Sequence, residues 1–461
     1  MGIENRVPFP RGMSLFTRGI RNISGSSPFA FKMGFSKEGL FEFFFGKGVT
    51  IAASSHVGGG SHVYSAVHCR PAEDDFWDGH VDNISSESMN RHYEAALTRL
   101  GSVVPTPEHK MPNTTTERFG NSNILEPAVP YKGARIGYLL PADPDNPKVV
   151  ETQNGVKRQE VDYKANDDGF LGSPGGGKTS LDVAYLWPAM QTGNLTVRDM
   201  AEVKEIRNLG TRAGTNMGYE VTYQDLRGRK LKTIRAKRVI LAAGTLNTLK
   251  LLMQSRNSGG LAGMPHLGRN FGTNGDMMGI WDRSAGDKDL TAGLPSRGGF
   301  RLRGEEDSPV FGGGAPASST SYPLPKWMKR RISQSLMVYG LGVDAHDGKA
   351  SFEGGRFRLQ FDAAGSPVFE KQWTAAKKIG ERTGTSLYVR HQAATIHPMG
   401  GAGLGRDETN GVIDGNGEVF GNPGLFVTDA SAFPTSLGAP PSLSIAAWSE
   451  HVVEQLLTAP R

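Results

Sequence analysis

Hydrophobic residues gather in three short runs along the chain, and each run ends on small residues where a loop or a helix begins. Residues 49–53 predict a strand that leads into a glycine-rich stretch. Residues 238–244 are mostly apolar and end on glycine, and residues 245–255 then follow a helical period. Residues 425–429 form the third run. Such strands are typical of an open α/β sheet, whose ligands bind at the carboxyl ends of the strands.

Helical and hairpin patterns fill part of the space between these runs. Apolar residues recur at helical spacing in residues 85–99, where Ser85 or Ser86 can cap the helix. Similar patterns predict helices at residues 181–190, 373–383 and 443–457, strands within 195–206, and a hairpin of 219–223 with 231–234. By contrast, loops and irregular structure are predicted for residues 1–45, 103–168 and 276–335.

The predicted fold class is therefore α/β with α+β insertions. One Rossmann-like, nucleotide-binding sheet is assembled from discontinuous segments, and a second domain is inserted between them. A chain of 461 residues is long enough for two or three domains. Its 61 glycines indicate many tight turns and close backbone approaches to a bound molecule.

Charge and cysteine content narrow the classes of partner. The net charge of +6 is dispersed along the chain, which argues against nucleic-acid binding. The densest positive cluster, Lys329 to Arg331, could equally contact an anionic membrane surface. The single cysteine, Cys69, excludes an internal disulfide framework and a thiolate metal site, and no metal site is predicted.

The compartment is expected to be reducing and cytoplasmic. No apolar window reaches the about 18 residues that a membrane span requires. Residues 1–11 show no apolar stretch after a basic one, so no signal peptide is predicted.

Residues 172–179 satisfy the phosphate-loop pattern GxxxxGK[ST]. In a working site of that kind, Lys178 neutralises the phosphates and Thr179 binds magnesium. The loop must be delivered by a buried strand, but residues 162–168 are polar and turn-forming. A phosphate-loop NTPase is therefore a distant alternative.

His397 is the best candidate for chemistry, because Pro398, Met399 and two glycines follow it and leave little bulk around it. A neutral imidazole can remove the proton of a hydroxyl group at physiological pH. Gly58 to Gly60 let backbone pass close to a flat ligand, and Asp429 can bind a ribose or ribityl hydroxyl. Taken alone, such a histidine is more often structural, the glycines are as often a plain flexible turn, and the aspartate is also typical of a turn.

These pieces occur in the order found in the glucose-methanol-choline (GMC) flavoprotein oxidoreductases, and the chain resembles the cholesterol oxidase branch of that family. The resemblance rests on residues 57–64, 180–186, 192–193, 203–206, 241–246, 251–252, 272–275, 397–401 and 424–431. It implies FAD as the cofactor and His397 as the base that faces the flavin ring. It also implies a set of cofactor-binding residues: Gly58, Gly59, Gly60, Ser61, Tyr64, Ser65, Val67, Val203, Ala243, Gly244, Asp429, Ala430, Pro440 and Ser442.

The resemblance implies a domain organisation as well. The FAD-binding domain comprises residues 45–105, 180–280 and 395–461, and residues 1–44 are a connecting segment. The substrate-binding domain comprises residues 106–179 and 281–394 and is expected to contain an antiparallel sheet.

Three departures from the family pattern bear on function. The opening strand–GxGxxG–helix unit is absent, so the chain is expected to begin a few tens of residues late. Pro440 stands where cholesterol oxidases have an asparagine, and it offers no side-chain hydrogen bond. Gly313 stands near the place of the glutamate base of the steroid enzymes, which argues against ring isomerisation.

The sequence thus predicts an FAD-dependent oxidoreductase that acts on CH–OH groups. The expected substrate is an apolar, steroid-like alcohol, which places the protein in steroid metabolism, and oxygen or another molecule accepts the electrons. The alternative is a truncated, non-catalytic GMC remnant that binds FAD poorly.

Overall fold

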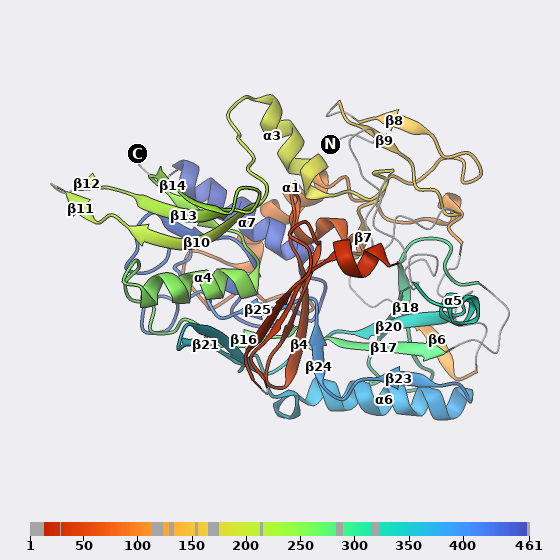
Figure 1. The fold of residues 1–461 in the computed structure, drawn as a ribbon. Helices are drawn as coiled ribbons and strands as arrows, with labels where there is room; N and C mark the ends of the chain where they lie inside the picture. The colour runs from red at the N-terminus through yellow and green to blue at the C-terminus, as the bar shows by residue number, and fades with distance from the viewer. Residues whose placement is uncertain are drawn as a thin grey trace.

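The structure of the chain is a computed structural model. It describes residues 13–27, 29–112, 123–128, 133–152, 155–164, 175–212, 215–282, 289–314 and 323–458. Figure 1 shows a three-stranded sheet with helices on one side of the molecule and a six-stranded sheet above a long helix on the other. A five-stranded sheet lies between them.

The parallel pair at the centre of the predicted nucleotide-binding sheet forms as expected. Strand β15 (Val239–Leu241) pairs in parallel with β26 (Leu425–Val427), although almost 190 residues separate them in the sequence. Helix α4 (Thr245–Asn257) follows β15 directly and lies against β10 (Ala201–Asn208). The hairpin is confirmed as β13 (Tyr219–Asp225) and β14 (Lys230–Ala236), which form a separate three-stranded sheet with β10.

The prediction of irregular structure for residues 20–45 is wrong. These residues form β1 (Ile20–Gly25), β2 (Phe31–Gly34) and β3 (Phe41–Phe45) of a five-stranded sheet. The sheet continues through β4 (Val49–Ser54) to β24 (Ala393–Thr395). Every residue of β3 is half-buried, so the strand carries no alternation of polar and apolar positions that would have marked it.

The prediction of loops for residues 276–335 is also wrong, since much of a six-stranded antiparallel sheet lies there. Its order is β23 (Leu387–Val389), β17 (Met277–Asp282), β20 (Ser335–Gly340), β19 (Phe311–Gly314), β18 (Ser296–Leu302) and β6 (Leu125–Ala128). Helix α6 (Pro367–Thr383) packs on one face of this sheet (Figure 1). Strands β18 and β19 are rich in glycine, so their sequences lack the alternation of polar and apolar side chains that predicts a strand.

The remaining elements are short, apart from two long helices. They are η2 (Leu15–Gly19), η3 (Gly59–His62), β5 (Val67–His68), α1 (Ser86–Arg99), η4 (Pro107–His109), β7 (Arg135–Ile136), β8 (Val149–Glu151), β9 (Lys157–Gln159), η5 (Asp182–Leu186), α3 (Trp187–Gln191), β11 (Thr211–Arg212), β12 (Thr215–Asn216), β16 (Phe271–Gly272), α5 (Lys326–Ser333), β21 (Lys349–Glu353), β22 (Arg356–Gln360), η7 (Ala363–Gly365), β25 (Met399–Gly400), η8 (Ala430–Ala432) and α7 (Ser442–Thr458). The predicted cap of α1 is confirmed, because Ser85 Oγ accepts from the Ser88 N–H at 3.1 Å.

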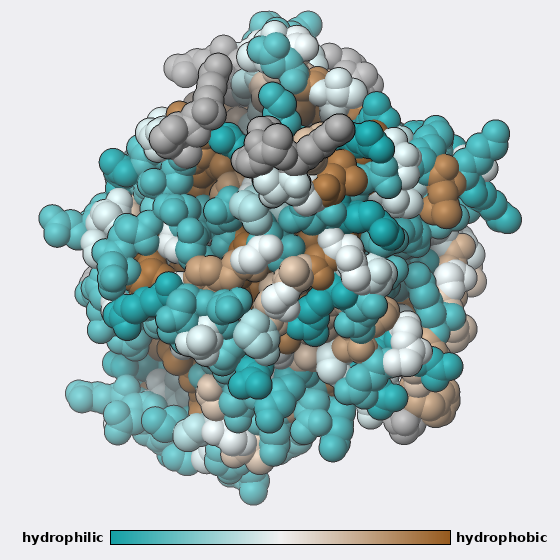
Figure 2. All heavy atoms as spheres, turned by 90° about the vertical axis from the view of Figure 1, so that its left-hand side faces the viewer, coloured by the Kyte–Doolittle hydropathy of each residue, from teal (hydrophilic) through white to brown (hydrophobic). Residues whose placement is uncertain are grey.

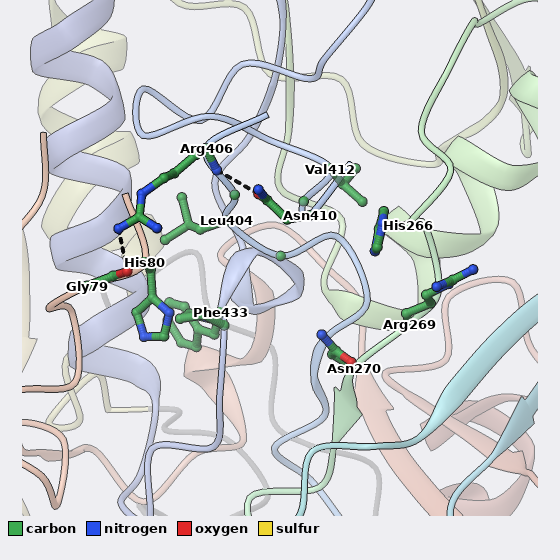
Figure 3. Close-up of a pocket in the computed structure, with 14 residues that line it drawn as sticks. Gly79, His80, His266, Arg269, Asn270, Leu404, Arg406, Asn410, Val412 and Phe433 are labelled. Carbon is green, nitrogen blue, oxygen red and sulfur yellow. Dashed lines mark hydrogen bonds between the residues drawn. The ribbon is translucent and has the colours of Figure 1, made fainter. Parts of the chain in front are cut away.

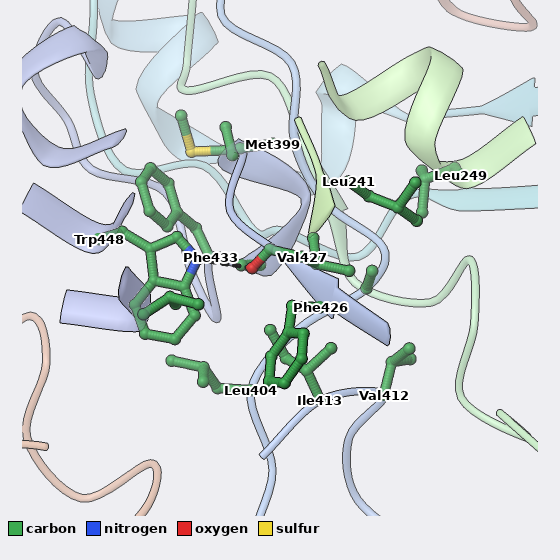
Figure 4. Close-up of a cluster of buried hydrophobic side chains, with 14 of the residues drawn as sticks. Leu241, Leu249, Met399, Leu404, Val412, Ile413, Phe426, Val427, Phe433 and Trp448 are labelled. Atoms are coloured by element: carbon green, nitrogen blue, oxygen red, sulfur yellow. Dashed lines mark hydrogen bonds between the residues drawn. The ribbon is translucent and has the colours of Figure 1, made fainter. Parts of the chain in front are cut away.

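The main hydrophobic core lies around β15 and β26. Figure 4 shows Trp448 of α7 beside Phe433, with Val427 of β26 close to them. The Trp448 indole donates to the Val427 carbonyl at 3.0 Å and stacks on Trp77 with ring centres 5.9 Å apart. This core fixes the carboxyl ends of β15 and β26, where the sequence predicts the cofactor.

The surface over the three-stranded sheet is mainly hydrophilic, with hydrophobic residues in separate spots (Figure 2). The positive cluster at Lys329 to Arg331 lies on α5, which also exposes Trp327 to 67%. Its contact with a membrane surface stays a prediction. Among the described residues, no helix has both the length and the apolar character needed to cross a bilayer.

Candidate active site

His397 forms a pair with a buried carboxylate. It follows β24, and its Nδ1 lies 3.0 Å from Asp276, just before β17. Asp276 also accepts from the Thr395 hydroxyl at 2.7 Å and from the Ile396 N–H at 3.1 Å. Because a carboxylate only accepts hydrogen bonds, the His397 Nδ1 carries a proton, so in the neutral ring the lone pair lies on Nε2. The imidazole is therefore oriented as a base.

A second buried carboxylate shapes the loop that delivers Asp276. Asp344 Oδ2 accepts from the N–H and the hydroxyl of Thr273 and from the Gly275 N–H, at 2.7 to 3.2 Å. Asn274, with a φ of 60°, donates to the Ala439 carbonyl at 2.9 Å and accepts from the Gly438 N–H at 2.8 Å. The turn before β17 is thereby fixed to the segment that leads into Pro440.

The glycine-rich loop, residues 58–67, follows β4 and crosses the same region. Gly58 and Gly59 have φ values of 97° and 60°, which residues other than glycine rarely adopt. A Cβ on Gly59 would meet no atom within 4 Å, so the backbone of the loop is open on that side. Ser61 is buried, and its hydroxyl donates to the Gly58 carbonyl at 2.6 Å, which closes the loop on itself.

The end of β15 is open in a similar way. Ala243 and Gly244 are exposed, and a Cβ on Gly244, whose φ is 75°, would meet nothing within 4 Å. The Gly244 N–H donates to Asp429 Oδ2 at 3.0 Å, and Thr248 donates to the same oxygen at 2.5 Å. Burial raises the pKa of Asp429, and Ser431 also donates to its Oδ1. Oδ2 of Asp429 therefore ties the end of β26 to the start of α4, and Oδ1 caps the short helix η8 that follows β26.

Several contacts bring the predicted site residues together. Ser442 Oγ donates to the Val67 carbonyl at 3.4 Å, and the Cys69 thiol lies 3.7 Å from the Pro440 carbonyl. The Thr245 hydroxyl donates to the Pro398 carbonyl at 2.6 Å, which connects α4 with the residue after His397. The glycine-rich loop, the β15 and β26 ends and His397 thus belong to one region of the molecule.

Two other candidates from the sequence are Val203 and the phosphate-loop pattern. Val203 lies on β10, opposite Tyr223 of β13, and is 41% exposed. Residues 172–174 of the pattern lie outside the described residues. Lys178 is fully buried and donates to the carbonyls of His62 and Tyr64, so its ammonium group points into the protein and not toward a phosphate.

A surface pocket of about 310 Å³ lies elsewhere, between residues 266–270 and 403–412 (Figure 3). His80, His266, Arg269 and Arg406 are among its lining residues, and none of the predicted site residues lines it. The pocket therefore does not belong to the predicted site.

Asp276 is the site residue that the sequence did not single out. It is buried and lies 121 positions before His397, at the start of a strand that was expected to be a loop. The only local signal was the turn Gly272–Gly275 followed directly by an acidic residue.

A neutral, buried histidine beneath the loop gives a pH-dependent prediction. Burial lowers the pKa of His68 to about 4. The Tyr64 hydroxyl donates to the Thr179 carbonyl at 2.6 Å, so His68 Nε2 donates to that hydroxyl oxygen and Nδ1 accepts from Ser102. Protonating His68 would place a charge on a buried ring and reverse the second of these bonds, so that Nδ1 donates to the Ser102 hydroxyl.

Stability is therefore expected to fall with acidification between pH 6.5 and about 4. His68 has its ordinary pKa of 6.5 in the unfolded chain, which therefore binds the proton at a higher pH than the folded chain does. Each pH unit of acidification in that window lowers the free energy of unfolding by about 1.4 kcal/mol. Denaturant unfolding of the wild type and of His68→Gln at several pH values checks this. The variant should have the smaller pH slope, and parallel curves would contradict the assignment.

The chain is similar to known proteins of one family. Residues 151–274 and 345–449 match the two parts of a family described as GMC oxidoreductase. The chain is 24% identical to a cholesterol oxidase of Acinetobacter baumannii over 91% of this chain and 84% of that protein. It is 46% identical to an oxygen-dependent choline dehydrogenase of Staphylococcus aureus, but over only 17% of this chain and 13% of that protein.

A solved structure shows the same fold. An FAD-dependent oxidoreductase from Chaetomium thermophilum superimposes with a TM-score of 0.54 at 14% identity, over 99% of this chain and 95% of that one. The chain belongs to the GMC oxidoreductase family, whose members are flavoproteins that use FAD.

The residues present fit a flavin cofactor. Open glycine backbone at Gly59 and Gly244 leaves room for a flat ring system and for phosphates at the N-terminus of α4. The His397 side chain is 21% exposed, so it is accessible from one side while Asp276 holds the other. The roles of the individual cofactor-binding residues stay predictions.

Proposed function

We propose that the protein oxidises the hydroxyl group of an apolar, steroid-like alcohol with His397 as the base. The observation that carries this proposal is the 3.0 Å contact between His397 Nδ1 and Asp276, which leaves Nε2 free to receive the hydroxyl proton. Bound FAD would supply the acceptor for the hydride that leaves the alcohol carbon. The electron acceptor that reoxidises it is oxygen or another molecule.

The residues of the chain would bind the cofactor and move the hydroxyl proton. Asp276 fixes the tautomer of His397 and stabilises its positive charge after proton uptake. Residues 58–67, 243–244 and 429–430, together with Pro440 and Ser442, would hold the cofactor by close backbone contacts. Pro440 contributes no side-chain donor, so His397 is the proposed proton acceptor in this part of the site.

Two observations support an apolar substrate. The chain is similar to a protein named cholesterol oxidase over 91% of its length. From Asp276, β17 runs on with Met278 and Ile280 on the face of the six-stranded sheet away from α6, and Ile280 is 55% exposed. An exposed apolar residue four positions along the chain from Asp276 suits a substrate with a large hydrocarbon surface.

The substrate proposal is tested by turnover with a panel of alcohols. A sterol, an aryl alcohol and choline differ in size and charge while each carries a hydroxyl group. A higher kcat/KM for the sterol than for choline supports the proposal, and a preference for the cationic choline would contradict it.

The alternative is a chain that binds FAD poorly and does not catalyse oxidation. Among the described strands β15 pairs only with β26, and Ile240 of β15 is 47% exposed. The visible spectrum after incubation with FAD and desalting separates the two proposals. Retained flavin bands favour the oxidoreductase, and a colourless protein favours the alternative.

A further inference from the structure

Lys178 is a fully buried cation beneath the glycine-rich loop. Its Nζ donates to the His62 carbonyl at 2.8 Å and to the Tyr64 carbonyl at 3.0 Å. It also lies 5.8 Å from the centre of the Tyr64 ring. An ammonium group is costly to bury unless it is well hydrogen-bonded, so these contacts with residues 62 and 64 are strong constraints on the loop.

The segment that carries Lys178, residues 175–179, is held in place from several sides. The Thr179 N–H donates to the Gly137 carbonyl and the Leu139 N–H donates to the Gly177 carbonyl, both at 2.8 Å. The Tyr64 hydroxyl donates to the Thr179 carbonyl at 2.6 Å. Lys178 therefore projects toward the loop from a fixed piece of backbone.

The contact with Tyr64 determines which way the next peptide group faces. In a trans peptide the C=O and the N–H point in opposite directions. Since the Tyr64 carbonyl points at Lys178, the Ser65 N–H points to the other side of the loop. It has no acceptor among the residues that the structure describes.

The loop would not keep this conformation easily by itself. Ala66, the next residue, is buried and has a φ of 51°, which is unfavourable for a residue with a Cβ. Its carbonyl accepts from the Gly137 N–H at 2.8 Å. Lys178 and Gly137 thus hold both sides of a strained turn.

We propose that Lys178 is a positioning residue of the flavin site. It fixes residues 62–66 so that the Ser65 N–H is presented to the flavin, and its charge raises the reduction potential of the bound cofactor by favouring added negative charge nearby. The proposal rests on the proposed function, because it takes residues 58–67 as the flavin loop. The lysine of the apparent phosphate loop therefore serves the cofactor site through the loop backbone.

Arg158 offers a matched control. It is also buried, and it donates to the Gly176 carbonyl at 2.7 Å and, at 3.2 and 3.1 Å, to the Gly177 carbonyl and the Thr179 hydroxyl. These bonds hold segment 175–179 and not the glycine-rich loop. Arg158→Met should lower stability while leaving Lys178 and its charge beside the loop.

The test compares the full-length wild type with Lys178→Met, Lys178→Gln and Arg158→Met. The first readout is the midpoint potential of bound FAD, and the second is amide hydrogen exchange of residues 60–66 without added FAD. Lys178→Met should lower the potential and raise exchange in the loop at least about tenfold, since two partly buried carbonyls lose their donor. Lys178→Gln keeps a donor without the charge, so it should lower the potential with a smaller effect on exchange.

Arg158→Met should lower the melting temperature, and it should change the potential less than Lys178→Met does, because Arg158 acts on Tyr64 through its charge alone. If Lys178→Met has the same midpoint potential and the same loop exchange as the wild type, the proposal is overturned. If Lys178→Met fails to fold, an unchanged potential in Lys178→Gln overturns the role of the charge. A wild type that retains no FAD contradicts the proposed function instead, and loop exchange in the variants then still decides whether Lys178 fixes residues 60–66.

Discussion

His397→Ala is expected to lower kcat for alcohol oxidation about 10²- to 10⁴-fold while the protein still binds FAD. The expectation follows from the loss of a positioned general base, which contributes a factor of this size in enzymes. The Asp276 carboxylate keeps its bonds from the Thr395 hydroxyl and the Ile396 N–H, so the end of β24 should stay in place.

Steady-state turnover and flavin content of the purified variants measure this effect. His391→Ala is the matched control, because His391 is exposed six positions earlier and lies against Trp373 with ring centres 4.8 Å apart. The control should have the activity of the wild type. Turnover by His397→Ala within a few-fold of the wild type, with FAD bound, would remove His397 as the base.

Asp276→Asn is expected to lower kcat at least about 100-fold, although it changes only one atom. The amide oxygen can still accept from Thr395 and Ile396, which leaves the NH₂ group facing His397 Nδ1. His397 Nδ1 must then accept a hydrogen bond from the amide, so the ring proton moves to Nε2. Nε2 thereby loses the lone pair that would receive the hydroxyl proton of the substrate. The tautomer is wrong even though the fold is kept.

The controls for this variant are its melting temperature and its flavin content. Both should lie near those of the wild type if Asp276 acts through the tautomer of His397. A large loss of both would show that Asp276 is mainly structural. Full activity in Asp276→Asn would contradict the orientation of the base that the 3.0 Å contact implies.

The sequence predicted the elements whose signals are local. The cap at Ser85, the hairpin of β13 and β14, and the apolar strand before Gly244 each follow from neighbouring residues. The family resemblance then placed these pieces in order, and the family matches confirm it.

The elements that depend on distant pairing were not predictable in this way. Strand β24 joins β4 in parallel, so Ala393 lies opposite Val49, and neither segment contains information about the other. Asp276 becomes a site residue only because the start of β17 lies beside the end of β24. Lys178 matched a phosphate-binding pattern in its letters, while its function depends on backbone more than 100 positions earlier.

The most direct test of the account is anaerobic mixing of the FAD-loaded, full-length protein with an apolar secondary alcohol. If the protein is an alcohol oxidoreductase with His397 as its base, the visible flavin bands should bleach with the alcohol and stay unchanged with the corresponding ketone. The bleaching should be slowed at least about 100-fold in His397→Ala. Flavin bands that persist in the wild type with every alcohol offered would contradict the account.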